Sequence, residues 1–325
     1  MHMFAMFRRS LLAGAGAAAL VSGLGLAPAL AQDGKLSVVA TTGMIADAVA
    51  QVGGDRVEVQ ALMGPGVDPH TYRQTRSDIA AMTGADAVFW HGLYLEAQLE
   101  DFFRDLAGEK TVIALAEGLP GNRLLADEEY EGRNDPHVWM DPSLWSGVVE
   151  AARDALTEID PEGADTFAAN AEAHLAEIAA LGEYSGEVLA TVPQDARVLV
   201  TAHDAFNYFG AAYDYEVMGI QGISTESEAG LAQIENLVGV LVDRGIGAIF
   251  VESSVSDRNV MALVEGAGAQ GHTVTIGGEL FSDAMGDPGT YEGTYIGMID
   301  HNVTTITRAL GGEAPEKGMN DRLGE

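Results

Sequence analysis

The chain of 325 residues contains no cysteine. It therefore forms no disulfide, offers no thiolate to a metal and has no cysteine to be acylated behind an export signal. Basic residues are also scarce, because 17 Lys and Arg stand against 49 Asp and Glu, for a formal net charge of -32. Nucleic-acid binding depends on Lys and Arg at phosphates, so this balance argues against a nucleic-acid partner. It favours a cationic ligand, although an acidic surface that only keeps a protein soluble has the same composition.

Long hydrophobic runs are missing beyond the N-terminus. The apolar run Leu11–Leu26 follows the basic pair Arg8-Arg9 and precedes the small-x-small sequence Ala29-Leu30-Ala31. This order is typical of an export signal peptide, here residues 1–31, and the run is too short for a membrane helix of roughly 20 apolar residues. The paired arginines permit either ordinary secretion or the twin-arginine route. With no cysteine to lipidate, we expect a free periplasmic protein that starts at Gln32.

Segments with strand and helix patterns alternate along the rest of the chain. Runs such as Leu36–Ala40 and Ala87–Trp90 are separated by segments with helical periodicity, and the alternation resumes after Pro193. Such alternation predicts mostly parallel sheets covered on both faces. Between the two regions, Pro161–Val192 has helical periodicity and would reach roughly 45 Å as one helix. We therefore expect an α/β protein with two sandwich lobes joined by one long rigid helix.

Chain length also fits two domains. Without the signal peptide about 290 of the 325 residues remain, which at ~100 to 200 residues per domain predicts two. The predicted parts are a signal peptide at 1–31, an N-terminal α/β lobe at 32–158, a linking helix at 159–192 and a C-terminal α/β lobe at 193–325.

Four short segments each place one metal-binding type of side chain in a predicted loop. They are GVDPHTY with His70, DPHVWMDP with His137, VTAHDAF with His203 and ELFSDAMGD with Asp283. Imidazole and carboxylate are ligands that zinc or manganese accepts, and three His with one Asp make a closed coordination shell. Ligands of open α/β sheets bind beyond the carboxyl ends of the strands. Because two candidates precede the long helix and two follow it, we expect the ion in a cleft between the lobes.

Neighbouring side chains are candidates for supporting this site. The carboxylates of Asp68, Asp135 and Asp204 lie beside the three histidines, where they could accept the second ring N–H and fix the tautomer. Trp139 is expected to form a dry wall under the site or to be an ordinary core aromatic. Glu252 ends a predicted strand and is expected to be a carboxylate behind the ligands or a surface residue.

Four further histidines are expected to lie outside the set of ligands. His91 ends a predicted strand and could approach the cleft. His174 in the long helix, His272 in a turn and His301 in the closing helix are explained by solvation or local hydrogen bonds.

Because imidazole must be neutral to bind a metal, we expect binding to weaken below about pH 6.

Taken together, GVDPHTY, NDPHVWMDP, TAHDAFNYFGAAY and GGELFSDAMG with EGTYIGMIDHNVTTI resemble the zinc- and manganese-type solute-binding proteins of ABC importers. The resemblance covers residues 35 to about 312. It implies two lobes joined by one rigid helix and metal ligands at His70, His137, His203 and Asp283. It also implies a periplasmic monomer that captures Zn²⁺ or Mn²⁺ and passes the ion to an ABC permease in the inner membrane.

The chain departs from both dedicated types within that family. Members that prefer manganese tend to carry Glu at the third ligand, in a segment resembling T-x-E-G, where this chain has His203. Many zinc receptors carry a long loop rich in His and acids before the second ligand, whereas Gly121–Asn134 is short, acidic and free of His. Three imidazoles favour zinc on the affinity order of divalent metals, and manganese stays open as the cargo.

Two other classes of function are alternatives to a receptor that performs no catalysis. A zinc-dependent hydrolase needs an open coordination position and a general base. The chain has no HExxH sequence, so Glu252 would be the candidate base. A metal-independent adhesion protein would not depend on His70.

In a receptor, release of the metal requires a small shift of the lobes, and we expect movement of the loops near His203 or Asp283 to provide the route.

Overall fold

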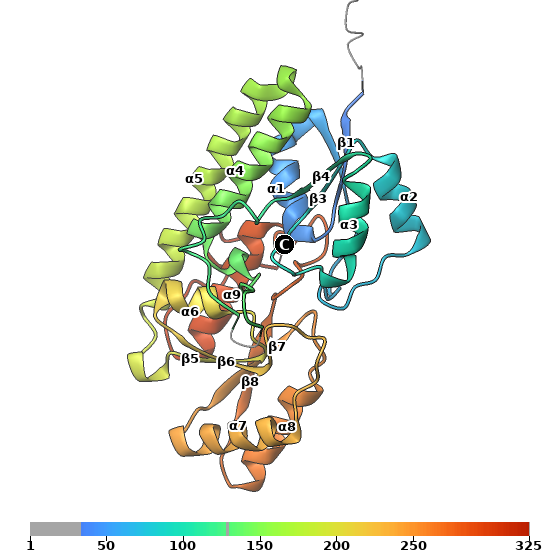
Figure 1. The fold of residues 1–325 in the computed structure, drawn as a ribbon. Coiled ribbons are helices and arrows are strands. Elements are labelled where there is room, and N and C mark those ends of the chain that lie inside the picture. Colours follow the sequence, from blue (N-terminus) through green and yellow to red (C-terminus); the bar gives the residue numbers. More distant parts are fainter. Residues whose placement is uncertain (1–33, 128–129, 325) are drawn as a thin grey trace, which may run out of the picture. The chain divides into compact units, whose positions relative to one another are not determined.

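Parallel strands alternate with helices in the computed structural model, which describes residues 34–127 and 130–324 (Figure 1). Every strand pair within the sheets is parallel. The predicted α/β class with mostly parallel sheets is therefore confirmed. The predicted signal peptide at 1–31 lies outside the described residues. Among those residues, no helix combines the length and the apolar character needed to cross a membrane.

The first sheet has the strand order β2-β1-β3-β4, and its two central strands, β1 and β3, are mostly buried. Its elements are β1 (Leu36–Ala40), α1 (Gly43–Gly53), β2 (Val57–Ala61), α2 (Arg76–Gly84), β3 (Ala87–Trp90), α3 (Glu100–Leu106) and β4 (Thr111–Ala114). Successive residues of a strand point to opposite faces. Val38 and Phe89 accordingly pack in the core that contains α1, whereas Val39 and Val88 pack with α2 and α3. The apolar strands thus fit a sheet covered by helices on both sides.

Two long helices, α4 (Pro142–Ile159) and α5 (Ala164–Leu189), lie side by side after this sheet (Figure 1). Helix α4 was not among the elements predicted, although its N-terminus has strong signals: Asp141 accepts a hydrogen bond from the backbone N–H of Ser143, and proline follows at the first helical position. The long helix predicted within 159–192 is α5. It packs against α1 and α4 and also against α9 (Tyr295–Ala309).

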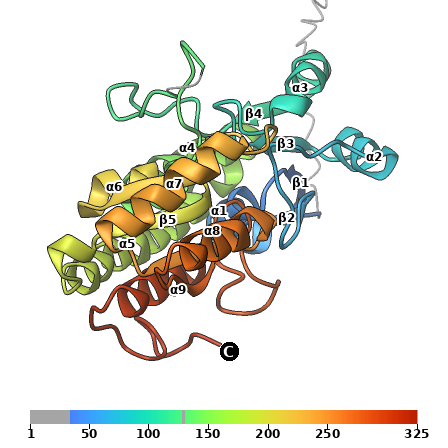
Figure 2. The same ribbon diagram turned by 90° about the horizontal axis from the view of Figure 1, so that it is seen from below.

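The later part of the chain contains two pairs of parallel strands. The elements are β5 (Val198–His203), α6 (Asn207–Tyr213), β6 (Glu216–Gln221), α7 (Leu231–Arg244), β7 (Ala248–Glu252), α8 (Arg258–Ala269) and β8 (Thr275–Leu280). β5 pairs with β6, and β7 pairs with β8. Helices α7 and α8 lie next to each other (Figures 1 and 2) and share a core with Val200 and Ile249. On the other side of the strands, Leu199 and Phe250 join the core that includes α9.

One predicted location is wrong in a way that bears on the site. His203 was expected in a loop but is the last residue of β5, where it pairs with Gln221 of β6. The strand therefore carries His203 into position directly. Asp283, by contrast, lies beyond the end of β8 as predicted.

The main apolar core passes from the first sheet through α4 and α5 to the last strands and α9. Its members include Val38, Trp145, Ile178, Phe250 and Val303. The described residues accordingly form one unit by their contacts. The division into lobes at 158/159 and 192/193 stays a prediction.

Candidate metal site

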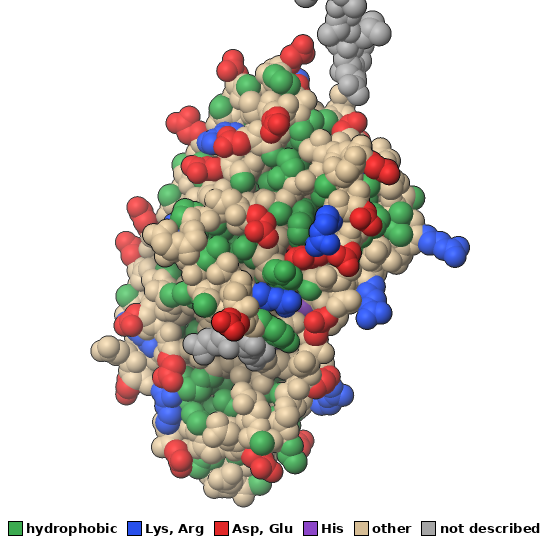
Figure 3. Space-filling view, viewed as in Figure 1, with side chains coloured by type: hydrophobic (Ala, Val, Ile, Leu, Met, Phe, Trp, Pro, Cys, Tyr) green, Lys and Arg blue, Asp and Glu red, His purple; other side chains and the backbone are tan. Residues whose placement is uncertain are grey.

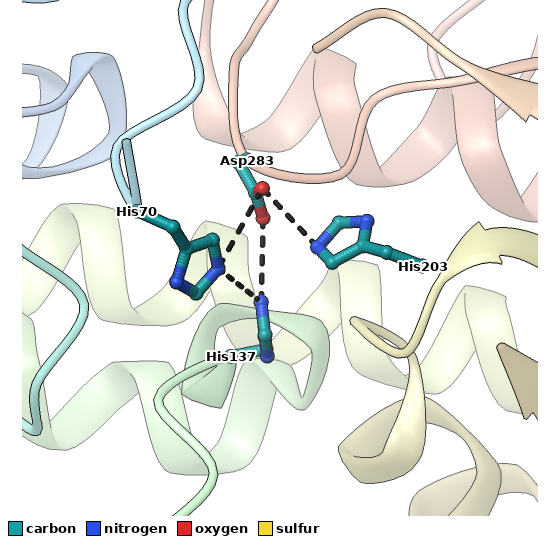
Figure 4. A group of neighbouring side chains, drawn as sticks. All are labelled: His70, His137, His203 and Asp283. Atoms are coloured by element: carbon teal, nitrogen blue, oxygen red, sulfur yellow. Dashed lines mark hydrogen bonds and ion pairs between the residues drawn. The ribbon is translucent and has the colours of Figure 1, made fainter. Parts of the chain in front are cut away.

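The four candidate ligands come from four separate segments and converge on one point (Figure 4). His70 follows β2, His137 directly precedes a short 3-10 helix, His203 ends β5, and Asp283 follows β8. Each residue is at most 3% exposed, and one nitrogen or oxygen from each lies within 4.8 Å of the others. Figure 4 shows the three imidazoles turned toward the carboxylate of Asp283.

The distances between these atoms match a coordination shell. Four ligands at ~2.0–2.1 Å from a tetrahedral metal stand about 3.3–3.4 Å from one another. His137 Nε2 lies 3.3 Å from His70 Nε2 and 3.4 Å from Asp283 Oδ1. Asp283 Oδ2 lies 3.2 Å from His203 Nε2 and 3.9 Å from His70 Nε2. Because the two carboxylate oxygens face different histidines, Asp283 has the geometry to bind an ion through both.

Several of these atoms have no hydrogen-bond partner in the protein. Both carboxylate oxygens of Asp283 and Nε2 of His203 are buried and lack one among the described residues. Their mutual contacts allow attraction between charges but are not aligned as hydrogen bonds. A buried polar atom without a partner costs about 1–3 kcal/mol. A cation at the point that these atoms face would satisfy them together.

Carboxylates behind two of the imidazoles fix which nitrogen faces that point. Asp135 Oδ1 lies 2.7 Å from His137 Nδ1 and also accepts the backbone N–H of His137 at 2.9 Å. Glu252 Oε2 lies 2.5 Å from His203 Nδ1, and its Oε1 accepts the backbone N–H of His203 at 2.8 Å. Each imidazole therefore donates from Nδ1 and presents Nε2 to the centre. The supporting role predicted for Asp135 is confirmed, and of the two alternatives left for Glu252 the structure shows a buried carboxylate behind a ligand rather than a surface residue.

The parallel predictions for Asp68 and Asp204 are wrong. Asp68 Oδ1 accepts the backbone N–H of His70 at 2.9 Å, so it orients the loop rather than the ring. The position expected for Asp204 behind His203 is taken by Glu252, which lies 49 residues away in the sequence. No local pattern in the sequence indicates that Glu252 rather than Asp204 supports His203, because β5 and β7 meet only in the folded chain.

Burial and charge shift the pKa values of the histidines in opposite directions. Burial lowers the pKa of His70 to about 3. Burial alone would also lower the pKa of His137, but the charge of Asp135 and its hydrogen bond outweigh burial and raise that pKa to about 9. At neutral pH in the absence of metal, His70 is therefore neutral and His137 is cationic.

The pKa values of His203 and Asp283 are also shifted in opposite directions. Burial would lower the pKa of His203, yet the charges of Asp283 and Glu252 raise it well above its usual value. Burial would raise the pKa of Asp283, yet the charges of His203 and His137 hold it well below its usual range. The metal-free site thus carries two protonated imidazoles around one carboxylate, and a metal ion has to displace those protons.

Both alternatives left for Trp139 hold, because it is a fully buried residue of the main core and also lies against the site. Its ring lies 5.2 Å from that of His137, and its Nε1–H donates to the carbonyl of Ser282 at 2.7 Å. It therefore also anchors the residue before Asp283. Tyr208 of α6, which sequence reasoning missed, donates to the carbonyl of Asp135 at 2.9 Å.

The other four histidines of the described residues lie outside the converging group. His91 Nε2 is 2.7 Å from the carbonyl of Pro136. His272 and His301 are near backbone carbonyls, as their ring nitrogens lie 2.8 Å from that of Ile246 and 2.9 Å from that of Glu279, but these partners are distant in the sequence rather than local. His174 is buried rather than solvated, and its Nδ1 lies 3.5 Å from Glu177 Oε2 one turn along α5, although neither ring nitrogen has a hydrogen-bond partner among the described residues.

The fold and the site together define a metal-binding receptor of the solute-binding class. A sequence profile described as zinc-uptake complex component A, periplasmic, matches residues 38–309, and the chain belongs to this family. It is 47% identical over 279 residues to the manganese-binding lipoprotein MntA of Bacillus subtilis and 46% identical over 280 residues to the zinc-binding protein TroA of Treponema pallidum. Each alignment covers 86% of this chain and 90% of the relative.

A solved structure of the periplasmic zinc-binding protein TroA from Treponema pallidum has the same fold. It superposes with a TM-score of 0.83 at 45% sequence identity, over 85% of this chain and 99% of that one. The resemblance drawn from the motifs is therefore confirmed across nearly the whole described chain.

Proposed function

We propose that this protein captures a divalent transition-metal ion with His70, His137, His203 and Asp283 and delivers it to an ABC importer. One observation supports the proposal above all: buried nitrogen and oxygen atoms from four distant segments face a common point at coordination spacing, and those of His203 and Asp283 have no hydrogen-bond partner among the described residues. The proposal does not depend on the excess of acidic residues in the chain. Figure 3 shows acidic side chains spread over the visible face rather than gathered in one patch.

Zinc is the favoured cargo and manganese the second candidate. Three imidazoles and one carboxylate bind zinc more strongly than manganese at equal geometry. The names of the relatives do not separate the two metals, since MntA is named for manganese at 47% identity and TroA for zinc at 46%. The donor set therefore decides our preference.

Capture without catalysis fits the way the carboxylates are used. Both oxygens of Glu252 are engaged by His203, one by its ring and one by its backbone. A hydrolase would need a free base beside a metal-bound water. Glu252 is already committed to orienting a ligand, and Asp283 supplies the fourth ligand.

Location and partner follow from the same proposal. The N-terminal signal predicted at 1–31 would export the chain by the general secretory or the twin-arginine route. We propose a periplasmic monomer that meets a permease in the inner membrane. The family is described as periplasmic. MntA of Bacillus subtilis is named a lipoprotein, whereas this chain has no cysteine that could carry a lipid.

Metal content and competition test the proposal directly. Protein purified from its own periplasm is expected to contain close to one zinc or manganese per chain by elemental analysis, and zinc is expected to displace manganese in titration. Asp283→Ala should abolish tight binding, whereas His272→Gln, a histidine remote from the site, should not. Metal bound equally by both variants would contradict the assignment of the site.

Delivery is tested in the host cell. Deletion of the gene is expected to lower cellular zinc or manganese when the metal is scarce, and the wild-type gene should restore it. Restoration by Asp283→Ala as well would show that transport does not use this site.

A further inference from the structure

The loop at 222–230, which joins β6 to α7, reaches across to the segment that carries His70. Ile223, Ser224 and Glu226 of this loop line a cavity of about 190 Å³, and His70 lines the same cavity. Ile223 is buried, although it lies in an irregular segment. The loop therefore covers one side of the candidate metal site.

A hydrogen-bond relay connects this loop to the backbone of His70. Thr225 Oγ1 donates to Asp68 Oδ2 at 2.6 Å, across 157 residues of sequence. The other oxygen of the same carboxylate accepts the backbone N–H of His70 at 2.9 Å. The loop has a second attachment, in which the amide of Gln98 donates to Glu226. Asp68 thus holds the loop and the ligand segment at the same time.

The His70 side is also the more suitable path for an ion. A second cavity, of about 260 Å³, adjoins Asp283 from another direction. Apart from Asp47 and Asp283, its lining consists of glycine and apolar residues. The cavity beside His70 instead offers oxygen ligands from Asp127, Asn134, Ser224 and Glu226. Arg133 also lines this cavity, with its guanidinium over the ring of Tyr94. Because a metal ion that leaves its site needs oxygen ligands or water around it, this side favours passage.

We propose that Thr225 is a positioning residue whose hydrogen bond to Asp68 latches the 222–230 loop over His70 and so controls metal release. This inference rests on the proposed capture function and adds its route. Opening of the loop removes the bond from Thr225 and exposes the cavity to water. His70 is then the first ligand to be reached, and it loses part of the support of its backbone.

The expected effect is kinetic. A hydrogen bond to a charged group contributes enough to favour the closed loop by roughly 10- to 100-fold. Thr225→Val keeps the shape of the side chain and removes the hydroxyl. We expect zinc to leave this variant roughly 10- to 100-fold faster than wild type, while the visible spectrum of the cobalt-substituted protein stays unchanged because the ligands are the same.

Stopped-flow transfer of zinc to a fluorescent chelator tests the inference on the full chain. Thr225→Ser restores the hydroxyl and should return the rate close to wild type, and Thr275→Val, at the start of β8, is the matched control with no expected change. Hydrogen exchange should rise within 222–230 in Thr225→Val only.

Either of two results would overturn the latch: a release rate in Thr225→Val within twofold of wild type, or equally fast release from Thr225→Val and Thr225→Ser. Failure of the proposed function is distinguishable, because wild-type protein would then bind neither zinc nor manganese.

Discussion

Metal binding should expel about two protons at neutral pH, because the metal-free site holds two protonated imidazoles. The carboxylates around them raise the pKa of His137 to about 9 and that of His203 well above its usual value, and Nε2 of both must be deprotonated to bind zinc. Loss of two protons predicts that the apparent zinc affinity rises on the order of 100-fold per pH unit around pH 7. The sequence alone placed the loss of affinity below about pH 6, where ordinary imidazole protonates.

The free energy of unfolding of the metal-free protein should fall as the pH rises, whereas the zinc affinity rises. The pKa of His137 is raised from 6.5 to about 9, so its contribution is fully present below pH 6.5 and is lost as the pH rises through 9. A shift of this size corresponds to about 3 kcal/mol, or roughly 5 to 10 °C in Tm. His203 acts in the same direction. The gap in Tm between zinc-loaded and metal-free protein should therefore widen from pH 6.5 to pH 8.5.

Isothermal titration calorimetry in buffers of different ionisation enthalpy counts the released protons, and thermal unfolding with and without zinc follows stability. His272→Gln should release the same number of protons as wild type. An affinity that stays flat between pH 6.5 and 8.5, with no heat that depends on the buffer, would refute the protonation states derived for His137 and His203.

The remaining predictions concern single groups. Glu252→Gln should weaken zinc binding by roughly 10- to 100-fold, since it removes the charge that makes His203 a basic ligand; an unchanged affinity in titration would mean that Glu252 has only a structural role. Excess zinc at 100 times Kd should stabilise the protein by about 2.7 kcal/mol, and a Tm that does not respond to zinc would contradict capture. Gly297→Ala should destabilise by about 3 kcal/mol or more, because the new Cβ would lie 1.8 Å from the carbonyl oxygen of Tyr291; chemical denaturation measures this, and a loss below 1 kcal/mol would show that α9 shifts easily.

Some of the supporting contacts around the site could be predicted from the sequence, and others could not. Asp135 was predicted because it precedes His137 by two residues and can reach that ring locally. Glu252 was a candidate without an assigned partner, and Asp204 was preferred behind His203 only because it is adjacent in the chain. Helices α4 and α6 were missed, and with α6 the contact of Tyr208 to the Asp135 segment.

By itself, the sequence determined the alternation of strands and helices, the parallel sheets and the four candidate ligands. These depend on local periodicity and on the donor chemistry of each side chain, which neighbouring residues suffice to define. Only the tertiary structure decided that the four donors share one point, that their free atoms lack other partners, and that the site holds two extra protons. Those properties arise from burial and from charges brought together across long stretches of chain, which no local pattern records.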